Sequence, residues 1–182
     1  MIAIEIPIPS ISTERLLLRA AKESDVDAFA AMAADPLFTR FIGGPVTGRA
    51  AAWLKIARQL GMWVMRGHGI WTVVEQQTGE VVGRSGLWWE PGWPGLEAVW
   101  FIASSCWGRG YAPEAARAAL RFAFEVHNAD RVVSVIRPDN VASIRVAEKI
   151  GETYDHTEHL HGADKHVYAI SRAEWARRGG EE

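Results

Sequence analysis

A strand–loop–helix–strand segment in the middle of the chain constrains the fold more than any other feature. An apolar run beginning at Leu96 leads through the loop CWGRGYAPEA, residues 106–115, into a helix expected from Pro113 to about His127. RVVSVI, residues 131–136, follows and is apolar along nearly its whole length, as in strands buried on both faces. Strands joined through a crossover helix pair in parallel. The sequence therefore predicts a parallel strand pair with a glycine-containing loop where the first strand meets the helix.

Strand-like and helical runs flank this segment. The expected strands are RLLLRA from Arg15, IWTVVEQ and EVVGRSGLWW joined by a QTGE hairpin turn, ETYDHTEH, and KHVYAIS. The expected helices are DVDAFAAMAAD, Arg49 to about Met65, NVASIRVAEKIG with Asn140 as N-cap and Gly151 as stop, and a short terminal helix. This order predicts an α/β fold with a mixed sheet that is antiparallel in its first part.

Composition limits the class of protein. A chain of 182 residues, 48% hydrophobic, predicts one domain over 1–182. A formal net charge of −2 gives no reason to expect nucleic acid or an anionic membrane as partner. The single cysteine, Cys106, excludes an intramolecular disulfide, and no apolar run has membrane length. We expect a soluble cytoplasmic protein, and a homodimer stays open.

The glycine-containing loop, residues 106–115, has a chemical interpretation. Gly108, Gly110 and Ala112 let a ligand approach the main chain, where N–H groups at a helix start form an anion site. Arg109 adds a positive charge suited to phosphate. The chain has no Walker motif, and Pro113 stands where a dinucleotide fingerprint needs its third glycine. An ordinary glycine-containing loop is the alternative interpretation.

Three motifs resemble one family. WGRGYA, residues 107–112, resembles the pyrophosphate loop Gln/Arg-x-x-Gly-x-Gly/Ala of the GNAT acetyltransferases, with Trp107 at the Gln/Arg position. NVASIRVAEKIG and STERLLLRAAKESD resemble segments of the branch similar to RimJ and RimL, the ribosomal-protein N-terminal acetyltransferases. Glu152 and Val99 depart from the pattern, which usually has phenylalanine and glycine there. The resemblance implies the GNAT fold, a mixed and mostly antiparallel sheet with a splayed parallel pair.

The resemblance also implies a cofactor site. It implies acetyl-CoA as donor, a pyrophosphate held by the loop's main-chain N–H groups, and a pantetheine arm paired with the main chain of Phe101 and Ile102. Asn140 is either a helix cap alone or also a pantetheine contact. The implied cofactor-binding residues are Phe101, Ile102, Trp107, Gly108, Arg109, Gly110, Tyr111, Ala112 and Asn140.

Two residues are candidates for the chemistry of direct transfer to a primary amine. Glu97 matches the position of a glutamate base in many GNAT enzymes, and Ser143 matches a serine thought to protonate the departing thiolate. A solvent-facing glutamate and an ordinary helix-start serine are the alternatives. Weaker base candidates are Glu90, Glu158, His156, His159, His161 and His166. The histidine spacing fits no common zinc pattern, so we expect no metal.

The acceptor is less constrained. The resemblance favours a protein or peptide N-terminal amine, while a small amine (an amino acid, polyamine or aminoglycoside) and a non-catalytic acyl-CoA-binding module are the alternatives. Trp53 and Trp175 are expected to serve packing. Trp88, Trp89 and Trp93 are interpreted as core residues, with an aromatic wall for the acceptor as the alternative.

Overall fold

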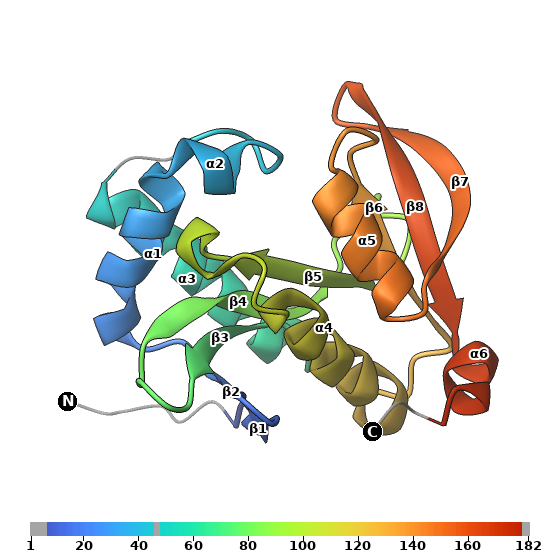
Figure 1. The fold of residues 1–182 in the computed structure, drawn as a ribbon, viewed down its shortest axis with the longest axis horizontal. Coiled ribbons are helices and arrows are strands. Elements are labelled where there is room, and N and C mark those ends of the chain that lie inside the picture. The colour runs from blue at the N-terminus through green and yellow to red at the C-terminus, as the bar shows by residue number, and fades with distance from the viewer. Residues whose placement is uncertain (1–6, 46–47, 180–182) are drawn as a thin grey trace.

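A mixed sheet of eight strands forms the centre of the computed structural model, which describes residues 7–45 and 48–179 (Figure 1). The strand order is β1-β2-β3-β4-β5-β6-β8-β7, and only β5 and β6 pair in parallel in the described sheet. The strands are β1 (Ile11–Ser12), β2 (Leu16–Arg19), β3 (Ile70–Glu75), β4 (Val81–Trp88), β5 (Glu97–Ile102), β6 (Arg131–Ile136), β7 (Thr153–Leu160) and β8 (Ala163–Ser171). The predicted fold class is confirmed.

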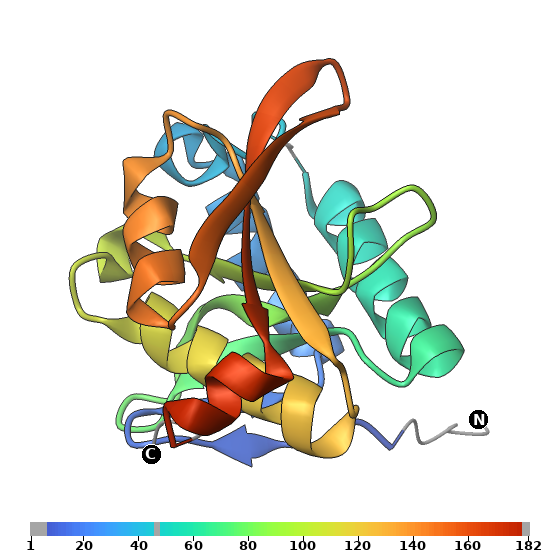
Figure 2. The ribbon, with the colours of Figure 1, turned by 90° about the vertical axis from the view of Figure 1, so that its right-hand side faces the viewer.

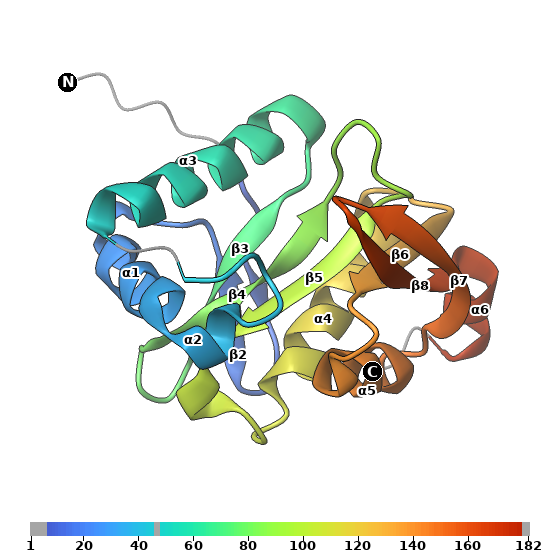
Figure 3. The same ribbon diagram turned by 90° about the horizontal axis from the view of Figure 1, so that it is seen from above.

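Helices cover both faces of the sheet. Figure 3 shows α1 and α3 on one face and α4 and α5 on the other side of the molecule. The β7–β8 hairpin projects beyond the rest of the sheet, as Figure 2 shows in red. The helices are α1 (Val26–Ala34), α2 (Pro36–Thr39), α3 (Arg49–Arg66), α4 (Tyr111–Arg121), α5 (Val141–Lys149) and α6 (Arg172–Arg177). In the described part of the chain, none of them is long and apolar enough to cross a bilayer.

Local signals fix where the helices begin and end. Asn140 caps α5 by accepting a hydrogen bond from the Ser143 N–H, and Gly151, with φ of 93°, follows its end, as predicted. The α4 helix begins at Tyr111, two residues before the expected Pro113, because Gly110 adopts a left-handed conformation and turns the chain into the helix. The helix then continues through a π-helical turn over Phe122–Val126.

Aromatic residues build the larger core. Trp63, Trp71 and Phe122 meet edge to face between the sheet and its helices, with ring centroids 4.8–5.7 Å apart. Trp175 stacks on Phe124 and is buried, which confirms its predicted packing role. The prediction for Trp53 is wrong, since the residue is 44% exposed on α3 and its indole N–H donates to the Glu23 carboxylate.

The parallel pair is short, and this positions the site. The registered contact between β5 and β6 joins Glu97 to Val133, and the Val133 N–H donates to the Leu96 carbonyl at 2.9 Å. Beyond this contact the two strands diverge, whereas β5 stays paired with β4 along its length. The divergence leaves one side of β5 without a strand partner in the middle of the sheet.

Two glycines give a matched test of packing. A Cβ on Gly86 would lie 2.2 Å from the Gly69 carbonyl oxygen, so Gly86→Ala should destabilise the fold by about 1–3 kcal/mol. Gly61, inside α3, has no atom within 4 Å of its Cβ position, so Gly61→Ala should stabilise the fold by up to about 1 kcal/mol. Urea unfolding of both variants measures these shifts, and equal effects would contradict the described packing of β4 against the chain before β3.

Candidate active site

A cleft of about 550 Å³ opens where β5 and β6 diverge. Its walls come from β5, β6, the loop before α4, the start of α5, and the α2 region. All the predicted site residues except Arg109 line it, namely Glu97, Phe101, Ile102, Trp107, Gly108, Gly110, Tyr111, Ala112, Asn140 and Ser143. Segments far apart in sequence thus meet where the resemblance places a cofactor and a reacting centre.

The loop at one end of the cleft presents unused hydrogen-bond donors. Gly108 and Gly110 have φ of 79° and 83°, and no side chain caps α4. The main-chain N–H groups of residues 108–112 have no hydrogen-bond partner among the described residues. Successive free N–H groups at the positive end of a helix bind anions. This end of the cleft can hold a phosphate group.

The motif STERLLLRAAKESD, residues 12–25, stabilises this loop through hydrogen bonds. The Glu114 carboxylate, in the first turn of α4, accepts hydrogen bonds from the Thr13 hydroxyl at 2.6 Å and from the Arg15 main-chain N–H at 2.9 Å. The Arg15 guanidinium bonds the same carboxylate and donates to the Arg109 carbonyl at 2.8 Å. The STERLLLRAAKESD segment is therefore in contact with the loop that contains WGRGYA, and Arg109 contributes its main-chain carbonyl.

Strand alternation decides which main-chain groups of β5 face the gap. The Ala98 carbonyl accepts from Ser134 of β6, whereas the Val99 carbonyl accepts from Ser85 of β4. Alternation then directs the main-chain groups of Trp100 into the gap and those of Phe101 toward β4. Sequence reasoning missed Trp100, because alternation gives two sets of residues and only the pairing of β5 with β4 and β6 shows which set faces the gap.

The Ile102 carbonyl is already in use. It accepts a hydrogen bond from the Trp107 indole at 2.8 Å. Within the described chain, the Trp100 N–H and carbonyl have no such partner on the gap side. Trp100 is thus the residue of this wall whose main chain is free to pair with an extended ligand.

Glu97 lies at the point where the strands part. Its carboxyl group accepts from the Val135 N–H of β6 at 3.1 Å and from the Trp93 indole at 2.8 Å, and the residue is 8% exposed. This burial excludes the interpretation of Glu97 as a solvent-facing residue. Burial also raises the pKa of Glu97 to about 8. A carboxyl group with this pKa gains or loses its proton close to neutral pH.

A second buried carboxyl group, Glu152, lies behind Ser134. The Ser134 hydroxyl is 3.0 Å from both the Glu152 Oε1 and the Ala98 carbonyl, and one hydroxyl proton can be donated to only one of them. A protonated Glu152 supplies the missing proton, in keeping with burial and the nearby Glu97, which raise its pKa to about 8. The departure from the family pattern at this position thus places a second acid beside the strand junction.

Asn140 and Ser143 lie together on the opposite wall. The Asn140 side chain accepts from the Ser143 main-chain N–H at 3.2 Å, which confirms the cap. The Ser143 hydroxyl is half-buried and has no hydrogen-bond partner among residues 7–45 and 48–179. It is available to a ligand in the cleft.

The weaker base candidates lie outside the cleft. Glu90 pairs with Arg58, and the others belong to the β7–β8 hairpin. The hairpin residues in question are His156, Glu158, His159, His161 and His166, of which His156 and His159 pair with aspartates. Among the described residues, no three His, Cys, Asp or Glu side chains are grouped to hold a metal ion.

The tryptophans before β5 lie outside the buried clusters. Trp88 and Trp89 are half-buried, with the guanidinium groups of Arg58 and Arg66 over their rings at 4.5 Å and 4.2 Å. Trp93 bonds Glu97. Their interpretation as core residues is wrong, because arginines of α3 cover two of the rings and the third orients the buried acid.

The two raised pKa values predict a pH-dependent stability. Between pH 5 and pH 8 the unfolded chain has ionised carboxylates, whereas folded Glu97 and Glu152 still bind protons. Their contribution to the free energy of unfolding is therefore greatest below the ordinary glutamate pKa and is lost as pH rises toward about 8. The free energy of unfolding, measured by urea titration at pH 5, 6.5 and 8, should fall less steeply with pH in Glu152→Gln than in the wild type.

The exposed Glu80 provides the control. Glu80→Gln should leave the pH slope of the wild type unchanged. A Glu152→Gln variant with the full wild-type slope would show that Glu152 is ionised in the folded state.

Comparison with known proteins agrees with this geometry. The model of the acetyltransferase (GNAT) domain family matches residues 15–153. YkkB of Bacillus subtilis, whose function is uncharacterized, is 33% identical over 156 residues, covering 80% of this chain and 86% of YkkB. The crystal structure of an acetyltransferase from Agrobacterium tumefaciens superimposes with a TM-score of 0.81 at 34% identity, covering 93% of this chain and 98% of that one.

A more distant structure shares the fold alone. The ribosomal-protein-S5-alanine acetyltransferase from Vibrio fischeri has a TM-score of 0.69 at 17% identity, covering 92% of this chain and 99% of that one. The family match extends from Arg15, which bonds the loop, to the first residue of β7, and so includes every residue that lines the cleft except Lys165. The chain therefore belongs to the GNAT acetyltransferase family and is an N-acetyltransferase of the GNAT type.

Proposed function

We propose that this protein transfers an acetyl group from acetyl-CoA to a primary amine, and that the amine is the N-terminus of a protein or peptide. The observation that carries the proposal is the run of free N–H groups at residues 108–112, which opens onto a cleft with Glu97 at its inner end. An anion site and a buried base at two ends of one cleft suit a long phosphorylated donor and a reacting amine.

The chain's groups match the parts of the donor. The N–H groups of residues 108–112, at the start of α4, would hold the pyrophosphate, with Arg109 beside them. The main chain of Trp100 would pair with the pantetheine arm, in place of the main chain of Phe101 and Ile102 that the resemblance implied. Phe101 and Ile102 line the cleft. Asn140 lies on the facing wall. When bound, acetyl-CoA supplies the acetyl thioester.

Glu97 and Ser143 would handle the protons. The amine nitrogen forms a bond to the acetyl carbon as the carbon–sulfur bond breaks. Glu97 takes the amine proton through a water molecule, and Ser143 donates a proton to the thiolate and regains one from solvent. An N-terminal amine has a pKa of about 8, and Glu97 has a pKa of about 8, so the proton transfer is closely matched.

The choice of an N-terminal amine rests on the motifs. WGRGYA and NVASIRVAEKIG resemble the branch similar to RimJ and RimL, and the Vibrio fischeri enzyme shares the fold. The α2 region adds apolar residues to the cleft beside β5, among them Leu37, Phe38 and Phe41. An extended peptide could lie against these side chains.

Gly108 tests the loop. Gly108→Val adds atoms where no protein atom lies within 4 Å, so the added bulk meets the ligand, and CoA affinity should fall at least about tenfold. Gly92→Val, at φ of 85° and also in open space, introduces the same backbone strain away from the loop and should keep CoA affinity. Isothermal titration calorimetry compares the two, and an unchanged Gly108→Val affinity would remove the loop from the site.

Glu97→Gln tests the base. The variant should lower kcat about a hundredfold to ten-thousandfold at pH 8 while CoA binds normally, because the carboxyl group is lost and the loop is intact. The ratio of wild-type to variant kcat should be smaller at pH 6 and widen toward pH 8, since Glu97, with a pKa of about 8, ionises over that range.

Two further variants sharpen this result. Ser143→Ala should show a smaller defect, and Glu90→Gln, at a carboxylate that pairs with Arg58 outside the cleft, should keep the wild-type kcat. A pH-independent ratio near one for Glu97→Gln would exclude Glu97 as the base.

A further inference from the structure

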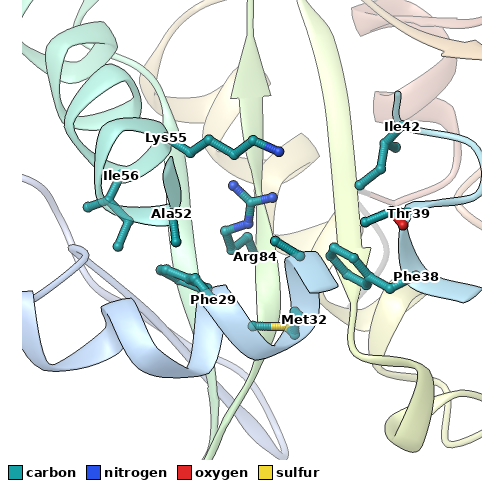
Figure 4. Close-up of a pocket in the computed structure, with 10 residues that line it drawn as sticks. Phe29, Met32, Phe38, Thr39, Ile42, Ala52, Lys55, Ile56 and Arg84 are labelled. Carbon is teal, nitrogen blue, oxygen red and sulfur yellow. The ribbon is translucent and has the colours of Figure 1, made fainter. Parts of the chain in front are cut away.

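A second, smaller hollow lies on the face of the sheet covered by α1 and α3, and Arg84 of β4 points into it (Figure 4). Arg84 is 9% exposed, and its guanidinium lies over the rings of Phe29 and Phe101 at 5.4 Å and 5.1 Å from their centroids. No carboxylate of residues 7–45 or 48–179 pairs with it. The charge is buried among apolar groups.

Lys55 brings a second positive charge to the same hollow. Figure 4 shows Lys55 reaching from α3 and Arg84 rising from β4, with both charged ends toward one space and Phe38, Thr39 and Ile42 on the far side. Burial and the neighbouring Arg84 lower the pKa of Lys55, and burial lowers the pKa of Arg84 to about 10. With this pKa, the Arg84 guanidinium is charged at neutral pH.

Two desolvated cations without a counter-charge are unfavourable. Leaving a buried charge uncompensated is strongly destabilising, and a like charge nearby increases that cost. A protein keeps such an arrangement where an anion completes it, and the planar guanidinium fork matches a carboxylate.

The hollow adjoins the candidate active site. Its present volume is about 10 Å³, room for one water molecule, and Phe38 and Ile42 line both the hollow and the large cleft. These two side chains are common to the walls of both spaces, and an acceptor in the cleft would have to displace them to reach the cations. The two cations therefore lie next to the part of the cleft wall formed by Phe38 and Ile42, along which an acceptor would lie.

Register gives the distance to the reacting end. Arg84 is paired with Phe101 in the β4–β5 ladder, and Glu97 lies four residues earlier on β5, on the same face of the sheet. Four residues of strand span about 13 Å. This is the length of about three or four extended peptide residues.

We propose that Arg84 and Lys55 form a carboxylate subsite, and that the preferred acceptor is an amine carrying a carboxylate about three or four residues' length away. The assignment rests on the proposed function, because the amine end is placed at Glu97. It also predicts that Arg84 is kept for binding at the expense of stability, since an apolar residue of similar length would suit the hollow better without an anion.

The test uses matched acceptors. Peptide amides with Glu or Gln at their third and fourth residues are compared as substrates, with L-glutamate as a small carboxylate source. The wild type should show a KM at least about tenfold lower for the Glu peptide. Lys55→Met and Arg84→Met should each reduce that preference, whereas Lys22→Met, at an exposed lysine outside both cavities, should keep it. A lower KM for L-glutamate than for the Glu peptide would overturn the length assignment.

A binding measurement separates this proposal from the function. Without CoA, the Glu peptide should raise the melting temperature of the wild type more than the Gln peptide, and Lys55→Met should abolish the difference. Arg84→Met alone should melt at or above the wild-type temperature. Equal KM values and equal melting shifts would overturn the subsite while leaving the acetyltransferase intact; a selective melting shift without acetylation would support the subsite and contradict the function.

Discussion

The parting of β5 from β6 is the constraint on which the rest of the site depends. A parallel pair in the middle of a sheet normally continues its ladder, and here it stops after Glu97 meets Val133. The Glu97 carboxyl group then takes the place of a main-chain acceptor for the Val135 N–H, so the same side chain ends the ladder and closes the inner end of the cleft. A carboxyl group placed this way is buried by the fold itself, which is why its pKa lies near 8.

The two ends of the cleft are held by different means. At the end beside α4, Arg15 and Thr13 hydrogen-bond to Glu114, so the segment between β1 and β2 stabilises a loop whose own N–H groups are left unbonded within the described residues. At the inner end, burial raises the pKa values of Glu97 and Glu152 to about 8. The conformation of the loop is thus fixed by the chain that precedes β2, which leaves the loop's N–H donors available to a ligand.

Much of this was predictable from local sequence signals. Glycine spacing, the Asn140 cap and apolar runs predicted the mixed sheet and the parallel pair, and the family resemblance predicted ten of the residues that line the cleft. Features set by tertiary contacts were missed. The side of β5 that faces the gap decides between Trp100 and Phe101, Arg84 is buried by helices remote in sequence, and the burial of Glu152 depends on Ser134 across the junction.

Amide chemical shifts during titration with CoA and with pantetheine test the central claim most directly. Pantetheine lacks the pyrophosphate, so it should shift the Trp100 amide and leave the amides of residues 108–112 unchanged, whereas CoA should shift both sets. The account predicts that the difference between the two ligands is concentrated in that loop. CoA binding that leaves the 108–112 amides unmoved would contradict it.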